Sequence, residues 1–224
     1  MLDNENLVEA GQRSFGRFLR TPIANPLDAV KGPARAFKWF RTKDWAGFTL
    51  IHPQLASSMI IQDAKYLATS EFYAGSGDEL HQYSANRAPG LHLPKDLLHS
   101  QVGFYAGGYG LGYRFGDDDV AIAIAIDATK QAPPVHGLLH LDPKGASHPL
   151  VVSARLPGGG TMYTNKIVYP AHGMIACGDD VFWGFKRAPL KWFESSVLRL
   201  GKGRGNRKAA GEHSSPLRDT SSDR

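Results

Sequence analysis

The side chains best suited to chemistry lie in one short stretch of the chain. Asp63, Lys65 and Glu71 interrupt apolar sequence around Tyr66 and Leu67. A carboxylate in this setting lies either at an exposed edge or in a polar cavity, where it is neutralised or paired with a cation such as Lys65. We therefore take Asp63 as the candidate catalytic group and Tyr66 as part of a candidate ligand site.

Two histidines form a second candidate group. His136 and His140 share one face of the strand expected over residues 135–141. They are half of a metal site, the lining of a cavity, or ordinary half-exposed side chains. A metal needs at least a third ligand, and the spacing dictates none. We expect no metal and no cofactor, and place both histidines in the candidate ligand site.

Three other motifs predict local structure rather than chemistry. The glycine-rich residues 107–112 lie between two expected strands, so they lack the helix that follows a phosphate loop and indicate a hairpin instead. The aspartates at 117–119 lack the ligand spacing of a calcium loop and predict a polar turn. Cys177 lies in a short apolar strand and is interpreted as a small buried side chain.

The clearest element is the segment Val-Ala-Ile-Ala-Ile-Ala-Ile at residues 120–126. An alternation without a polar face predicts a strand buried on both sides. The alanines either allow close packing of a second sheet or leave room for a ligand, and on the second reading Ala123 joins the candidate ligand site.

Roughly a dozen short strands at regular spacing predict a mainly β protein, an antiparallel lipocalin-like barrel or a sandwich. No helix alternates with them, which argues against a parallel sheet. The expected strands cover residues 45–51, 58–64, 69–74, 80–84, 95–98, 102–106, 111–115, 120–128, 135–141, 150–155, 162–169, 173–177 and 181–186.

One helical segment precedes the strands. Residues 25–40 have apolar side chains three or four apart, with Asn25 as N-cap, Pro26 in the first turn and a break at Gly32-Pro33. The segment is basic, so it either covers an edge or mouth of the sheet with its charges outward, or lies on a membrane surface.

The chain divides into a flexible arm over 1–24, a β domain over 25–191, and residues 192–224, a short helix followed by a disordered basic tail. The helix rests on apolar spacing over residues 189–200. Most of the formal net charge of +5 lies in the tail, which argues against a specific nucleic-acid-binding domain. A single cysteine and the lack of a membrane-spanning or signal segment favour the cytoplasm.

Several blocks resemble one uncharacterised family, the domain-of-unknown-function family 2804. Together they cover roughly residues 38–186 and comprise Trp-Ala-Gly-Phe at 45–48, Leu-His-Leu-Pro at 91–94 followed by Leu97-Leu98, Ala-Thr-Lys at 128–130, Pro-Pro-Val-His-Gly at 133–137, Pro-Leu-Val-Val at 149–152, Met-Tyr-Thr-Asn-Lys at 162–166 and Gly-Asp-Asp at 178–180.

The resemblance implies a lipocalin-like fold, distantly similar to carotenoid hydratase-like proteins that have two β domains in tandem. It would place this chain in the amino-terminal half of such a protein, as a truncated form, and it supplies no catalytic residues. Three functions follow as alternatives. The protein binds an apolar or amphipathic small molecule, acts as a hydratase or isomerase on a lipid or isoprenoid substrate, or is an interaction module that self-associates through an uncovered sheet edge.

Overall fold

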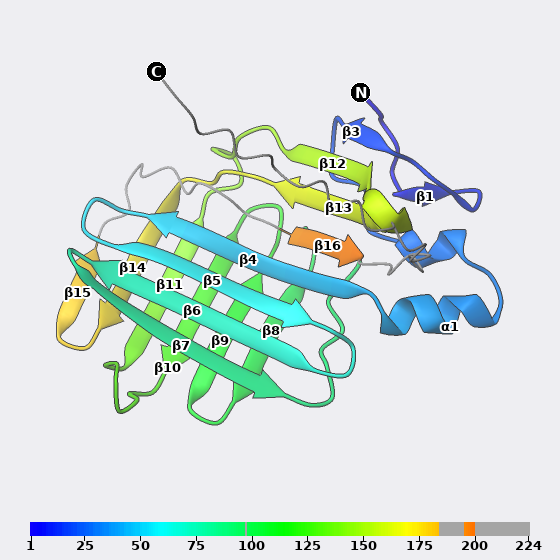
Figure 1. Cartoon of the computed structure of the whole chain (residues 1–224). Helices are drawn as coiled ribbons and strands as arrows, with labels where there is room; N and C mark the ends of the chain where they lie inside the picture. Colours follow the sequence, from blue (N-terminus) through cyan, green and yellow to red (C-terminus); the bar gives the residue numbers. More distant parts are fainter. Residues whose placement is uncertain (97, 184–194, 200–224) are drawn as a thin grey trace, which may run out of the picture.

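The computed structural model describes residues 1–96, 98–183 and 195–199, and in them the chain is mainly β (Figure 1). Two large antiparallel sheets pack face to face, and the strands of one cross those of the other (Figure 1). The predicted antiparallel β class is confirmed. Within the described residues the two sheets are separate layers rather than one closed cylinder.

The larger sheet has eight strands in the described part of the chain, in the order β3-β12-β13-β16-β4-β5-β6-β7. Their bounds are Gly16–Phe18, Leu150–Arg155, Thr161–Lys166, Ser195–Arg199, Lys43–Ile51, Ala56–Asp63, Ala68–Ser76 and Glu79–Arg87, in that order. Within the β4 to β7 meander, β5 and β6 alternate buried and half-exposed residues, which is the pattern of a sheet with one covered face.

The smaller sheet has six described strands, in the order β15-β14-β11-β10-β9-β8. They run over Asp180–Trp183, Ala171–Cys177, Val135–Leu141, Val120–Ile126, Tyr109–Arg114 and Gln101–Ala106. The glycine-rich residues 107–112 form the β8–β9 hairpin and most of β9, as predicted. The aspartates at 117–119 form the turn between β9 and β10, also as predicted.

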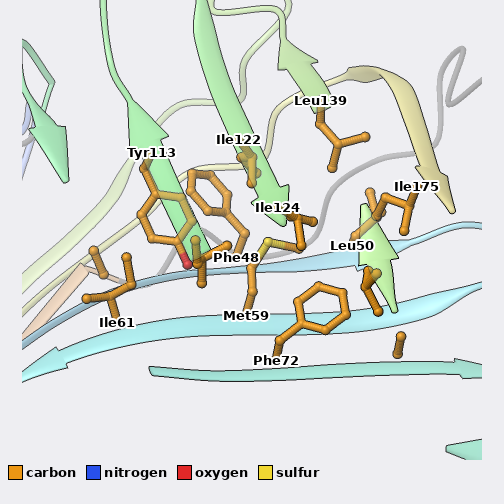
Figure 2. Close-up of a cluster of buried hydrophobic side chains, with 14 of the residues drawn as sticks. Phe48, Leu50, Met59, Ile61, Phe72, Tyr113, Ile122, Ile124, Leu139 and Ile175 are labelled. Carbon is orange, nitrogen blue, oxygen red and sulfur yellow. The ribbon is translucent and has the colours of Figure 1, made fainter. Parts of the chain in front are cut away.

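The core fills the space between the two sheets with large apolar side chains (Figure 2). Phe48, Met59 and Phe72 come from the larger sheet, and Tyr113 and Ile122 from the smaller one; all are at most 2 % exposed. The rings of Phe48 and Tyr113 meet edge to face with centroids 4.9 Å apart, a favourable arrangement for aromatic pairs.

A polar contact also joins the two sheets inside this core. The hydroxyl of Ser70 on β6 donates to the carbonyl of Ile60, and the hydroxyl oxygen of Tyr109 on β9 lies 2.9 Å from the same serine oxygen. Because the single hydroxyl proton of Ser70 is already used, Tyr109 is the donor in the second bond. Burial raises the pKa of Tyr109 to about 12, so it stays protonated.

The alternation in β10 has a different meaning from the one predicted. Ile122 and Ile124 point into the core, whereas Ala123 and Ala125 are exposed on the outer face of the smaller sheet. The prediction of burial on both faces is therefore wrong. Alanine is small and only weakly apolar, so an alanine row tolerates solvent where an isoleucine row does not.

The amino-terminal residues, expected as an arm, form three short strands. β1 (Val8–Glu9) pairs with β2 (Gln12–Arg13), and β3 joins the edge of the larger sheet. Leu7 and Phe18 are buried with Tyr163 in a second, smaller core. Strands of two or three residues are too short to leave a periodic pattern in the sequence.

The helical segment is confirmed as two short pieces. A 3-10 turn, η1 (Pro26–Ala29), is followed by α1 (Pro33–Phe40) after the predicted break. Asn25 precedes η1 but does not cap it, because its side-chain amide pairs with the backbone N–H and carbonyl of Val8. A further 3-10 turn, η2 (Pro157–Gly159), links β12 to β13.

Two expected elements are not found where they were predicted. Residues 195–199, part of the helix expected over 189–200, form strand β16, because the slot between β13 and β4 offers backbone partners on both sides. The rest of that helix and the basic tail lie outside the described residues. Residues 95–98 lie in a non-strand segment as far as they are described. In the part of the chain that is described, no helix has the length and apolar character needed to cross a membrane.

Candidate functional site

Asp63 ends strand β5 and holds the turn that follows it. One carboxylate oxygen accepts a hydrogen bond from the backbone N–H of Lys65 at 2.8 Å, and the other lies 2.5 Å from Lys65 Nζ. Lys65 has φ +75°, a left-handed conformation that turns its chain back toward the strand. The carboxylate therefore contacts Lys65 twice, by backbone and by side chain.

A second carboxylate completes a buried ionic cluster, which comprises Asp44, Asp63 and Lys65. Lys65 Nζ also contacts the carboxylate of Asp44 at the start of β4. The exposed fractions of the three side chains are 17 % for Asp44, 0 % for Asp63 and 5 % for Lys65. Charges this deeply buried require a charged partner, and the lysine serves both acids.

Gly90 packs the far side of this cluster. Its backbone N–H donates to the Lys65 carbonyl at 3.2 Å. A Cβ at this position would lie 2.6 Å from the Asp63 carboxylate and 2.7 Å from the Lys65 carbonyl. Only a residue without a side chain fits there, so the cluster is enclosed by backbone on this side.

A pocket of about 160 Å³ opens beside the cluster, between η1, the end of α1, the start of β4 and residues 92–95. Asp44 and Lys65 line it, whereas Asp63 lies behind them and does not. The rest of the lining is mostly apolar or aromatic and consists of Ala24, Asn25, Pro26, Leu27, Trp39, Thr42, Trp45, His92, Leu93, Pro94 and Lys95.

Several contacts hold the walls of this pocket in place. The backbone N–H of Ala24 donates to the carbonyl of Lys95 at 3.0 Å, which ties the amino-terminal wall to the opposite loop. The rings of Trp39 and His92 lie with centroids 5.8 Å apart. Thr42, which is 3 % exposed, donates its hydroxyl to the Lys38 carbonyl and fixes the end of α1. Contacts between neighbouring segments therefore hold the walls of the pocket in place.

Tyr66 follows Lys65 directly but lies outside the pocket lining. Its side chain is 52 % exposed, and its ring lies 5.3 Å from the ring of Phe40 on α1. Lys43 Nζ donates to its hydroxyl at 3.0 Å and lies over its ring. The structure therefore places Tyr66 with α1 on the surface, whereas Asp63 is buried.

The other predicted site residues gather on the outer face of the smaller sheet. Ala123 lies opposite Leu138, between His136 and His140 on the neighbouring strand, and Ala123 and His136 are exposed. His140 Nδ1 lies 3.0 Å from the carboxylate of Asp119, and its ring stacks on that of His172. The structure brings these three predicted residues together, but not with Asp63 or Tyr66.

Asp119 lies in the turn between β9 and β10, where it contacts both His140 and Arg114. The hydrogen bond with His140, and after it the bond from Arg114, hold the pKa of Asp119 below its usual value. In the described residues, no group of three or more His, Cys, Asp or Glu side chains is arranged to hold a metal.

Sequence reasoning missed most of the pocket. Asp44 could have been identified from the sequence. It alternates with Ala46, Phe48 and Leu50 along β4, and these residues face the core, so Asp44 lies on the same covered face. A charged side chain on the covered face of a strand needs an oppositely charged or hydrogen-bonding partner. Trp39, Trp45 and Leu93 carried no such signal, because the pocket depends on how distant segments meet.

The chain matches no protein-family model, and comparison with curated proteins and with solved structures also found no match. The resemblance to family 2804 stays a prediction. The hydratase or isomerase activity and self-association through a sheet edge stay predictions as well.

Proposed function

We propose that the protein is a binding module for a small amphipathic molecule, which it holds in the pocket beside the ionic cluster. The observation that supports this most directly is the composition of the pocket wall. Apolar and aromatic side chains form most of it, and the charged groups of Asp44 and Lys65 contact each other at the same wall. This combination is typical of small-molecule sites.

The size of the pocket limits what can enter. A cavity of about 150 Å³ is large enough for benzene, so a pocket of about 160 Å³ holds a ring or a short apolar chain. Trp39, Trp45 and Leu93 supply the surface for that group. A larger ligand would leave the remainder outside the pocket.

The ionic cluster supplies the polar contacts. Asp44 presents carboxylate oxygens and Lys65 presents an ammonium group at the pocket wall. A ligand with a hydrogen-bonding group beside its ring could contact either of them. The cluster is held from behind by Asp63, so the polar groups are fixed before a ligand arrives, which lowers the entropic cost of binding.

The test is saturation-transfer NMR with phenol, benzylamine and benzoate, which share one ring and differ in the charge of the polar group. Leu27→Trp should fill the pocket and abolish the signal of the probe that binds. Leu80→Trp, at a position 70 % exposed on β7, is the matched control and should leave it unchanged. If no probe binds, or if both variants bind equally well, the proposal fails.

Native mass spectrometry of protein purified from cells addresses the natural ligand. A co-purified molecule that is present with the unaltered protein and the Leu80→Trp variant, and lost with Leu27→Trp, would identify the occupant of this pocket. Retention of the molecule by the Leu27→Trp variant would place it elsewhere.

A further inference from the structure

Helix α1 lies on the surface, where Trp39 packs on His92 but the other aromatic side chains of the helix are half or more exposed. It projects beside the start of β4 (Figure 1), and all eight of its residues are exposed. The exposed fractions are 63 % for Phe37, 38 % for Trp39 and 50 % for Phe40. A surface helix of a globular protein normally buries its apolar side against the core, so this exposure needs an explanation.

The helix is nevertheless fixed at both ends. At its start, the guanidinium of Arg35 donates to the Leu27 carbonyl and pairs with Asp28. At its end, the buried Thr42 bonds to the Lys38 carbonyl. Isolated helices of this length are marginal in water, so these anchors hold α1 in place while Phe37 and Phe40 remain half or more exposed.

We give the name aromatic ridge to three exposed aromatic side chains on and beside α1, Phe37, Phe40 and Tyr66. Phe37 and Phe40 are three residues apart and therefore neighbours on the helix surface. The ring of Phe40 lies 5.3 Å from that of Tyr66, which extends the ridge beyond α1.

Basic side chains lie next to the ridge. Residues 31–43 contain five Lys or Arg and no Asp or Glu. Among the described carboxylates, only Asp28 pairs with one of these five, Arg35. The guanidinium of Arg41 lies 5.3 Å from the ring centre of Phe37, and Lys43 Nζ lies 4.3 Å from that of Tyr66. Each of these two cations is therefore positioned next to a ridge ring.

We propose that α1 and Tyr66 dock on a membrane surface that contains anionic phospholipid. Aromatic rings enter the boundary between headgroups and acyl chains, while Lys and Arg beside them contact the phosphates. The charge pattern favours this occupant over an apolar groove of another protein, because interface cores between proteins are depleted of lysine. The proposal does not depend on the ligand pocket.

Co-sedimentation of the full chain with vesicles tests the proposal. We expect binding to vesicles of phosphatidylcholine with phosphatidylserine, and much weaker binding to phosphatidylcholine alone. Phe37→Ala/Phe40→Ala should weaken vesicle binding by about tenfold or more, since two rings that would enter the membrane are lost. Lys38→Glu/Arg41→Glu should weaken it similarly.

Matched changes elsewhere on the surface are the controls. Tyr105→Ala/Leu138→Ala removes two exposed apolar side chains from the outer sheet face, and Lys130→Glu reverses a charge in a loop. Neither should change vesicle binding, and thermal unfolding should show that every variant folds. Absence of binding, equal binding to both kinds of vesicle, or binding that the α1 variants leave intact, as the basic tail would give, overturns the proposal.

Discussion

Asp44 and Asp63 lie directly opposite each other across the β4–β5 pair, and the ammonium group of Lys65 contacts both. Like charges at directly opposed positions of an antiparallel pair destabilise a sheet. The left-handed turn at Lys65 brings its side chain back along the strand end, so the chain supplies its own cation to this position. The cluster therefore links β4, β5 and one wall of the pocket.

Lys65→Met should destabilise the protein strongly, because it leaves two carboxylates facing each other in a buried site. Removing one partner of a buried ion pair costs about 3 to 5 kcal/mol. Urea unfolding measures the loss. Lys144→Met, which removes an exposed pair with Asp118, should cost at most about 1 kcal/mol. Adding Asp44→Asn and Asp63→Asn to Lys65→Met should recover much of the loss; equal costs at Lys65 and Lys144 would contradict this account.

Two buried tyrosines should respond in opposite ways to loss of the hydroxyl. The Tyr113 hydroxyl is buried and has no hydrogen-bond partner among the described residues, whereas that of Tyr109 bonds to Ser70 across the sheets. Tyr113→Phe should leave the free energy of unfolding unchanged or raise it, since it removes an unsatisfied polar group. Tyr109→Phe should lower it by about 1 to 2 kcal/mol. Urea denaturation of both variants measures this difference. A greater loss of unfolding free energy in Tyr113→Phe than in Tyr109→Phe would contradict the prediction.

The sequence predicted the strands well because each depends on local alternation and on the turns that flank it. The bounds expected for β11 and β12 agree with the structure to the residue. Burial was expected on both faces of β10 because the segment has no polar residue, but alanine is so small that a row of alanines can also face solvent. Strand β16 could not be foreseen, because its pairing with β13 and β4 joins segments far apart in the chain.

The candidate site was predicted only in its charged centre. Asp63 and Lys65 stood out as charges in apolar sequence, and the structure shows that they form an ion pair. The direction in which Tyr66 points, and the meeting of residues 24–27 with 92–95 to form a pocket, depend on tertiary packing that no local pattern encodes.

Gly90→Ala should disturb the cluster from its backbone side. The new methyl group would lie too close to the Asp63 carboxylate and the Lys65 carbonyl, and backbone cannot move aside as a side-chain end can. Overpacking of this kind costs about 1 to 3 kcal/mol. Gly112→Ala is the control, because its methyl group would meet the hydroxyl end of the exposed Tyr105 at 3.3 Å, and its cost should stay within about 0.5 kcal/mol. Thermal and urea unfolding compare the two, and equal stability would show that the turn at Lys65 relaxes.

His99 should make one surface contact dependent on pH. Its Nδ1 lies 2.9 Å from Asp96 and its Nε2 2.9 Å from Asp117, so it joins the loop before β8 to the β9–β10 turn. The hydrogen bond with Asp96, followed by that with Asp117, raises the pKa of His99 above 6.5. A raised pKa in the folded state means that this contribution to stability is complete below the unfolded pKa and is lost as pH rises through the folded value.

NMR titration of the His99 ring protons gives the folded pKa directly. Asp96→Asn should lower it toward 6.5, because the strongest of the bonds to the charged imidazole is weakened. His99→Gln should remove the fall in thermal stability that this residue causes as the pH rises from about 6.5 through its raised folded pKa. Lys130→Gln, a change in an exposed loop, should leave that pH dependence as it is. A His99 pKa at or below 6.5 in the unaltered protein would show that the two aspartates do not hold the imidazolium in solution.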